Sequence, residues 1–93
     1  MNETITINVI QEDINEYQRD NKLEPLICPI AKALKRETGY TWEVNYCTAF
    51  PCDNKEIVYL LPPLATKFIV NVDNYEPVTP STFTLTLQSK RNV

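Results

Sequence analysis

Two segments near opposite ends of the sequence alternate apolar and polar residues position by position. Residues 4–9, TITINV, and residues 82–87, TFTLTL, each place apolar side chains on one side and threonine or asparagine on the other. Successive side chains of an extended strand point to opposite faces of a sheet, so each segment can bury one face only. The alternation therefore predicts two half-buried strands, and Phe83, Leu85 and Leu87 face inward in the second.

The middle of the chain predicts two further strands. Residues 40–46, YTWEVNY, alternate in the same way, and residues 56–61, EIVYLL, form a short apolar run that stops at a pair of prolines. Between them, residues 47–55, CTAFPCDNK, are expected to form a loop or hairpin connection, because proline and an Asp-Asn pair favour turns. The residues expected on the apolar face of the first of these strands are Tyr40, Trp42, Val44 and Tyr46.

Two segments in the first half of the chain predict helices. Residues 11–20, QEDINEYQRD, carry apolar side chains at helical spacing and acidic residues in the first turn, where the helix dipole favours them. Residues 28–39, CPIAKALKRETG, predict a helix that begins at Pro29, because proline suits the first helical position. This helix is expected to end at Gly39, the only glycine of the chain, in a left-handed cap.

A third helix is predicted over residues 64–75, LATKFIVNVDNY, with Pro63 at or near its start. The residues that follow, up to Pro80, are expected to be extended, because proline excludes the helical conformation of the residue before it. The apolar stripe expected on this helix comprises Leu64, Phe68, Ile69 and Val72.

The predicted order of elements is β-α-α-β-β-α-β. We expect a single α+β domain over residues 1–93, with helices on one face of a mostly antiparallel sheet of three or four strands and a polar tail at about residues 88–93. The strand order stays open. The threonine-rich opposite face is expected to be solvated. The alternative is that this face, or an exposed edge strand by strand addition, offers a surface for a partner or for a second copy in a homodimer.

The composition limits location and partners. No apolar run approaches the roughly 20 residues needed to span a bilayer, and the N-terminal residues have no secretory pattern. We therefore expect a cytoplasmic protein with no membrane partner. The net charge of −3 disfavours nucleic acid, because phosphate backbones require a basic surface. The aromatic residues that would stack on bases, Trp42, Tyr40 and Tyr46, are expected on the core face.

The three cysteines, Cys28, Cys47 and Cys52, are an odd number, and no disulfide framework is expected without a secretion signal. Whether Cys47 and Cys52 pair is left open. A zinc site usually takes four ligands, and the chain has no histidine. We therefore expect no metal and no cofactor, and interpret the thiols as small packing groups.

Catalysis has little support among these residues. The chain has no histidine to serve as a general base near neutral pH, and a single glycine excludes a glycine-rich phosphate loop. Cys28 precedes a helix, where the dipole favours a thiolate, but a redox pair would need a second cysteine at Ala31. We expect no enzymatic activity and interpret Cys28 as a cap or packing residue. Unusual reactivity of Cys28 would reopen the question.

A TITV-like strand, a QEDI-like turn, a CPIA-AL helix and a closing PV-P-F strand motif run through nearly the whole chain. In these motifs the chain resembles a group of small bacteriophage and prophage proteins that have no assigned activity. The matching positions are Cys28, Pro29, Ile30, Ala31, Ala33, Leu34, Phe68, Ile69, Asp73, Pro77, Val78, Pro80 and Phe83. The segment CTAFPCDNK departs from the pattern by its length. The resemblance implies a phage origin and no catalytic residues, and small acidic phage proteins often act by binding.

We therefore expect a phage-type cytoplasmic binding protein that acts by stoichiometric contact with a host protein, such as a component of host antiviral defence that it inhibits. The expected contact surfaces are the acidic helix and the loop after residue 47. Their residues are Glu12, Asp13, Glu16, Asp20, Thr48, Phe50, Asp53 and Lys55. The alternative is an oligomeric protein that sequesters a nucleotide or another small ligand through Lys32, Lys35 and Arg36.

Overall fold

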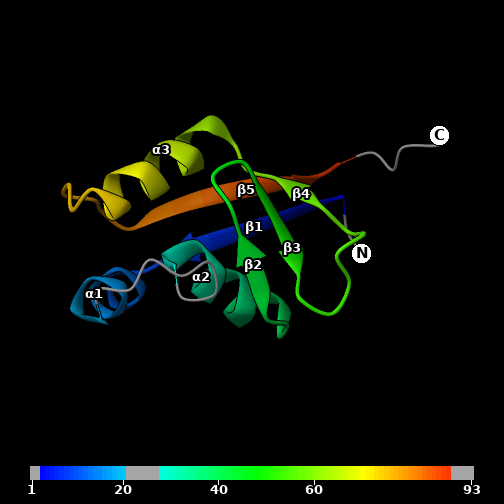
Figure 1. Ribbon diagram of the computed structural model, residues 1–93, viewed down its shortest axis with the longest axis horizontal. Helices are drawn as coiled ribbons and strands as arrows, with labels where there is room; N and C mark the ends of the chain where they lie inside the picture. Colours follow the sequence, from blue (N-terminus) through cyan, green and yellow to red (C-terminus); the bar gives the residue numbers. More distant parts are fainter. Residues whose placement is uncertain (1–2, 21–27, 89–93) are drawn as a thin grey trace.

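The structure is a computed structural model that describes residues 3–20 and 28–88, apart from the side chains of residues 18–20. Within this part of the chain, two helices follow the first strand, three strands come next, and a third helix precedes the last strand (Figure 1), which confirms the predicted α+β class. The elements are β1 (Thr4–Val9), α1 (Gln11–Asp20), α2 (Pro29–Thr38), β2 (Trp42–Val44), β3 (Thr48–Pro51), β4 (Tyr59–Leu60), α3 (Pro63–Asp73) and β5 (Ser81–Leu87). Of the predicted polar tail, everything after Gln88 lies outside the described residues.

The strands form one antiparallel sheet in the order β1-β5-β4-β3-β2, so that β1 and β2 are its edges. The expected three or four strands are too few, because part of the expected loop, Thr48–Pro51, forms β3 between β2 and β4. A proline normally argues against a strand. Pro51 is tolerated because it is the last residue of β3, and the neighbouring hydrogen bond to the β2 side comes from Cys52 N to Thr41 O, at 2.9 Å.

The strand predicted over residues 40–46 is shorter than expected, and its outer tyrosines are not in the core. Trp42 and Val44 are buried, as predicted, whereas Tyr40 and Tyr46 are 53% and 52% exposed. Tyr40 follows the left-handed Gly39, and Tyr46 lies in the turn that connects β2 to β3. Both tyrosines lie outside the regular pleat, so alternation does not determine where their side chains point.

The strand predicted over residues 56–61 is shorter than expected, and the buried face of the third helix differs from the predicted one. Only Tyr59–Leu60 of the run EIVYLL pairs with neighbouring strands. The helix α3 begins at Pro63 as expected, but Leu64 is 72% exposed and does not belong to the buried stripe. The stripe starts one residue later, at the i, i+3, i+4 and i+7 positions of a helix face. It consists of Ala65, Phe68, Ile69 and Val72.

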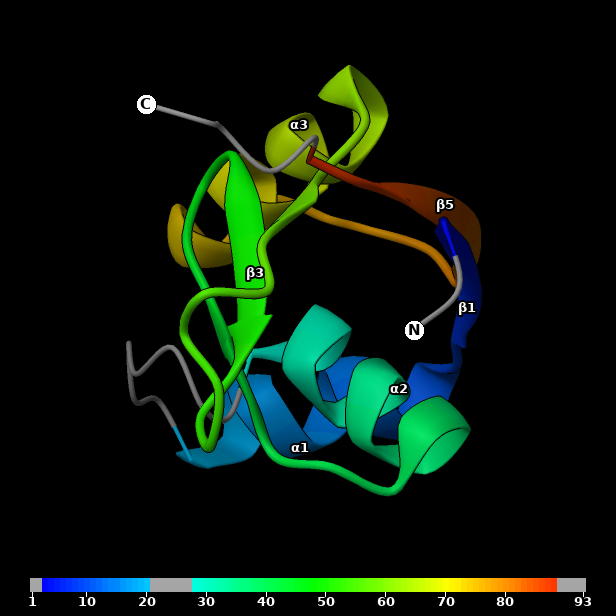
Figure 2. The ribbon, with the colours of Figure 1, turned by 90° about the vertical axis from the view of Figure 1, so that its right-hand side faces the viewer.

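The core lies on the inner face of a curled sheet. Ile7, Val9, Phe83 and Leu85 of β1 and β5 are buried, while the polar residues between them, Asn8 and Thr84, are exposed, as the alternation predicts. In Figure 2, α2 lies between β1 and β3, with α1 beside it and α3 at the opposite end of the molecule. Edge-to-face ring contacts connect β2 with β4 and α3 with β5. They join Trp42 to Tyr59 at 5.6 Å and Phe68 to Phe83 at 5.4 Å between ring centroids.

Both ends of α2 carry the caps that the sequence predicts. At the start, the Ala31 N–H donates to Cys28 Sγ at 3.4 Å, and Pro29 occupies the first helical position. At the end, Gly39 has φ 82° and its N–H donates to Lys35 O at 2.7 Å.

None of the helices in the described ranges is long and apolar enough to cross a membrane.

Candidate functional site

Asp13, expected to contact a partner from the surface of the acidic helix, is only 4% exposed. Arg36 of α2 donates from Nη1 and Nη2 to the two carboxylate oxygens of Asp13, at 3.0 and 2.8 Å. The Ile10 N–H also donates to Asp13 Oδ2 at 3.1 Å, so the same carboxylate caps the start of α1. Arg36 Nη2 further donates to Asn8 O of β1 at 2.8 Å. Asp13 is therefore a structural junction of β1, α1 and α2.

A second ion pair joins the same two helices. Lys32 Nζ lies 2.6 Å from Glu16 Oε1, and both side chains are partly exposed. Two residues expected to contact a partner, Asp13 and Glu16, are thus paired with two residues expected to bind a ligand, Arg36 and Lys32. Glu12 and Lys35 stay exposed to solvent. The side chain of Asp20, the last residue of α1, lies outside the described part of the chain.

Cys28 has the environment of a structural thiol. It is 7% exposed, and burial raises the pKa of its thiol from 9.0 to about 11, although hydrogen bonds from the Ala31 and Ile30 amides act in the opposite direction. A helix N-terminus by itself favours the thiolate, but here desolvation is the larger effect. Cys28 therefore caps the start of α2 and packs in the core, and its neutral thiol is a weak nucleophile at pH 7.

A carboxylate of α3 holds two tyrosines from distant segments. Tyr17 Oη donates to Asp73 Oδ1 at 2.9 Å, and Tyr46 Oη donates to Asp73 Oδ2 at 3.0 Å. Burial, and then the hydrogen bond to Asp73, raise the pKa of Tyr17, and the same carboxylate raises the pKa of Tyr46. This cluster connects α1, the β2–β3 turn and α3, and explains the position of the exposed Tyr46.

The loop that we expected to contact a partner divides into a strand and a turn. Thr48 and Phe50 lie on β3 and are half-buried, whereas Asp53 and Lys55 are exposed in the turn before β4. Asn54, between them, accepts a hydrogen bond at Oδ1 from the Glu56 N–H at 3.2 Å. The turn thus directs Asn54 and Glu56 to one end of the sheet.

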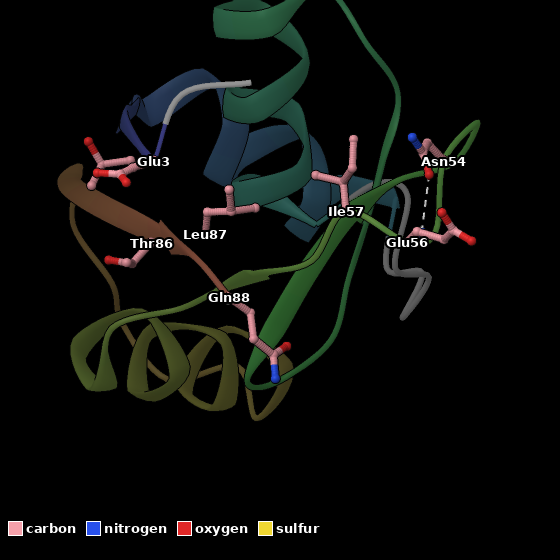
Figure 3. A pocket seen from close by; sticks show the side chains of 8 residues that line it. Glu3, Asn54, Glu56, Ile57, Thr86, Leu87 and Gln88 are labelled. Carbon is pink, nitrogen blue, oxygen red and sulfur yellow. Dashed lines mark hydrogen bonds between the residues drawn. The ribbon is translucent and has the colours of Figure 1, made fainter. Parts of the chain in front are cut away.

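At that end lies a recess of about 600 Å³, which we call the sheet-end recess (Figure 3). Figure 3 shows Ile57 and Leu87 between Glu3 on one side and Glu56 on the other. Apolar side chains thus occupy the middle, with a carboxylate on either side. The lining residues are Glu3, Thr4, Asn54, Glu56, Ile57, Thr86, Leu87 and Gln88.

A second recess of about 400 Å³ shares Thr4 with the first and lies between β1 and the end of α2; we call it the edge groove. Thr38 fixes its helical side, because Thr38 Oγ1 donates to Leu34 O at 2.7 Å and accepts from Trp42 Nε1 at 2.7 Å. The lining residues are Thr4, Ile5, Thr6, Glu37, Thr38, Tyr40 and Tyr59.

In the part of the chain that the structure describes, the charged side chains that line the two recesses are all negative. Their charged lining residues are Glu3, Glu56 and Glu37, and no lysine or arginine lines either of them among the described residues. No group of three or more cysteine, aspartate or glutamate side chains in the described ranges is placed to hold a metal ion. The surface therefore suits a basic group rather than a phosphate.

Sequence reasoning missed these three glutamates. Glu3 directly precedes β1, Glu37 lies on α2 and Glu56 lies in the turn before β4, and nothing in their local sequence connects them. The alternation of β1 did indicate that Thr4 and Thr6 face away from the core. It did not indicate that β1 lies at the sheet edge, beside α2. No protein-family model matches the sequence, and no solved structure matches the fold.

Proposed function

We propose that this protein is a phage-type cytoplasmic binding protein that acts by stoichiometric contact with a host protein and inhibits a component of host antiviral defence. The observation that carries the proposal is the pair of adjoining recesses whose charged residues are all carboxylates, Glu3, Glu37 and Glu56. Such a surface favours a basic region of a partner by charge complementarity. The phage-type resemblance supports the biological setting.

The proposed contact surface is not the acidic helix expected from the sequence. Asp13 and Glu16 are held by Arg36 and Lys32, so a partner would have to break existing ion pairs to use them. Within the described residues, no ion pair holds the carboxylates of Glu3, Glu37 or Glu56. Binding through the recesses therefore leaves the α1–α2 contact intact.

Recovery of the tagged protein from host lysate, followed by native mass spectrometry, tests this proposal. The wild type is compared with the double variant Glu3→Lys/Glu56→Lys. The matched control, Glu12→Lys/Glu76→Lys, has the same change in net charge at exposed positions outside the recesses. We expect a stoichiometric host protein with the wild type and the control, and its loss with the recess variant.

Two results would contradict the proposal. One is recovery of the wild type without any stoichiometric protein. The other is recovery of the same protein by the recess variant as by the wild type. A nucleotide retained on a homo-oligomer would support the ligand-sequestering alternative. That alternative has less support, because Lys32 and Arg36 already bind carboxylates, and of the three proposed ligand residues only Lys35 forms no ion pair within the described part of the chain.

A further inference from the structure

The strand β1 lies at the edge of the sheet, and its hydrogen bonds to β5 follow a definite alternation. Leu87 N donates to Glu3 O at 2.7 Å, and the register continues with Ile5 opposite Leu85 and Ile7 opposite Phe83. In an antiparallel pair, hydrogen-bonded and non-hydrogen-bonded residue pairs alternate. The odd residues of β1 therefore bond to β5, and the backbone groups of Thr4, Thr6 and Asn8 point away from the sheet.

Within the described residues, the edge of β1 that faces away from β5 is covered by a side chain at Asn8 and is uncovered at Thr4 and Thr6. Arg36 Nη2 binds Asn8 O at 2.8 Å and so covers the end of β1 nearest α1. No comparable side-chain bond to the backbone of Thr4 or Thr6 is found in the described part of the chain. Proteins usually protect edge strands from pairing with other chains. Here the protection extends only to Asn8.

The open part of the edge borders the edge groove. Ile5 and Tyr40 line this groove with apolar surface, the buried Tyr59 lies at its base, and Glu37 contributes a carboxylate. Where β1 begins, the groove meets the sheet-end recess with Glu3 and Glu56, since Thr4 lines both. A strand laid along Thr4 and Thr6 would place alternate side chains toward these surfaces, as in recognition by strand addition.

We propose that an extended, basic segment of the partner protein adds to β1 as a further strand at Thr4 and Thr6, an inference that rests on the proposed function and specifies its contact. The backbone of Thr4 and Thr6 supplies the hydrogen bonds, and Glu3, Glu37 and Glu56 select lysine or arginine side chains. A second copy of this chain is a poorer occupant. Its own β1, TITINV, carries no basic residue and would bring a second Glu3 to an acidic surface.

The first test uses a defined probe, an acetylated and amidated heptapeptide in which lysine and valine alternate. Binding is followed by the amide resonances of the labelled protein during titration. We expect the largest shifts at Thr4 and Thr6, with slowed hydrogen exchange there. The glutamate–valine heptapeptide is expected to bind at least roughly tenfold more weakly, and so is a lysine–valine peptide N-methylated at alternate residues. Equal binding of the N-methylated peptide would overturn the strand-addition geometry.

The second test blocks the edge by mutation. Thr6→Pro removes an N–H that points away from β5, so the β1–β5 ladder stays complete, and proline is tolerated at such edge positions. Its matched control, Thr6→Ala, also loses the Thr6–Thr84 hydroxyl contact of 3.0 Å but keeps the N–H. We expect roughly tenfold weaker peptide binding for Thr6→Pro relative to Thr6→Ala. If Thr6→Pro does not fold, Thr4→Pro and Thr4→Ala form the equivalent pair at the first residue of β1.

The outcomes separate this inference from the proposed function. A host protein recovered equally by Thr6→Pro and Thr6→Ala would leave the binding function standing and overturn strand addition at β1. Absence of any host protein with the wild type would overturn the proposed function itself. A homodimer of the wild type that Thr6→Pro converts to a monomer would show that a second copy occupies the edge, against our proposal.

Discussion

Asp13 and Arg36 lie on different helices, and each arm of the Arg36 guanidinium binds one carboxylate oxygen of Asp13. The Asp13 side chain is 6% exposed, whereas that of Arg36 is 46% exposed. The pair therefore shields the carboxylate while Arg36 extends over the surface to Asn8 O. Asp13, which the sequence alone assigns to a partner surface, therefore connects β1, α1 and α2.

Asp13→Ala is expected to lower the free energy of unfolding by about 2 kcal/mol. The substitution removes the cap of α1 and leaves Arg36 without its carboxylate acceptor, with only Asn8 O as its partner. Urea denaturation followed by circular dichroism measures the change. Glu12→Ala, on the exposed neighbour, is the control and should change stability by less than about 0.5 kcal/mol. Equal effects of the two substitutions would contradict the structural role of Asp13.

Tyr17→Phe is expected to cost about 1 kcal/mol of stability, because the Tyr17 ring is buried and its hydroxyl binds Asp73. Tyr46→Phe removes the equivalent hydroxyl from a half-exposed ring and should cost less. Both variants keep the ring, so the comparison isolates the two hydroxyl groups. A larger loss for Tyr46→Phe than for Tyr17→Phe would mean that burial does not determine their contributions.

Gly39→Ala is expected to destabilise the protein by about 1 kcal/mol, because an alanine at φ 82° is strained. No atom within 4 Å would meet the added Cβ, so the effect comes from the backbone and not from a steric clash. Gly39→Asn, which tolerates this conformation better, should recover part of the loss in thermal denaturation. If both variants equal the wild type, the cap contributes nothing.

Iodoacetamide at neutral pH is expected to modify the exposed Cys47 of the native protein before Cys28. Burial both restricts access to Cys28 and keeps its thiol protonated. Peptide mass spectrometry over a time course measures the order of labelling, and the unfolded protein in urea serves as the control in which both cysteines react. Preferential labelling of Cys28 in the native protein would revive the hypothesis of a catalytic cysteine.

The titration of Cys28 predicts a loss of stability at alkaline pH. Because folding raises its pKa from 9.0 to about 11, the unfolded chain releases this proton first as the pH rises. The unfolded state then binds fewer protons than the native state, so the free energy of unfolding falls between about pH 9 and pH 11. The total contribution is at most about 3 kcal/mol.

Cys28→Ser keeps a capping oxygen and removes the thiol, so it isolates this effect from that of Tyr17, whose pKa is also raised. Urea midpoints of the two proteins are compared from neutral pH to pH 11. The wild type should lose more stability than Cys28→Ser across this interval. Parallel curves would show that Cys28 titrates alike in the folded and unfolded states.

The candidate site was predictable only in part. The sequence indicated an acidic surface but placed it on the helix α1, whereas the outward direction of Thr4 and Thr6 followed correctly from alternation. Glu3 and Glu56 are brought together by the pairing of β1 with β5 and of β5 with β4, and Glu37 is added by α2, which packs against β1. These contacts join segments that are distant in the sequence, and local patterns carry no information on them.

By itself the sequence determined the local elements: the alternation of β1 and β5, Pro29 at the start of α2 and the left-handed Gly39 at its end. These depend on backbone conformations and side-chain periods that act over a few residues. Only the tertiary structure decided that Thr48–Pro51 is a strand, that Asp13 is buried by Arg36, and that β1 is an edge. Each of these depends on which distant segments pair, because a strand or a buried charge is stabilised by partners supplied elsewhere in the chain.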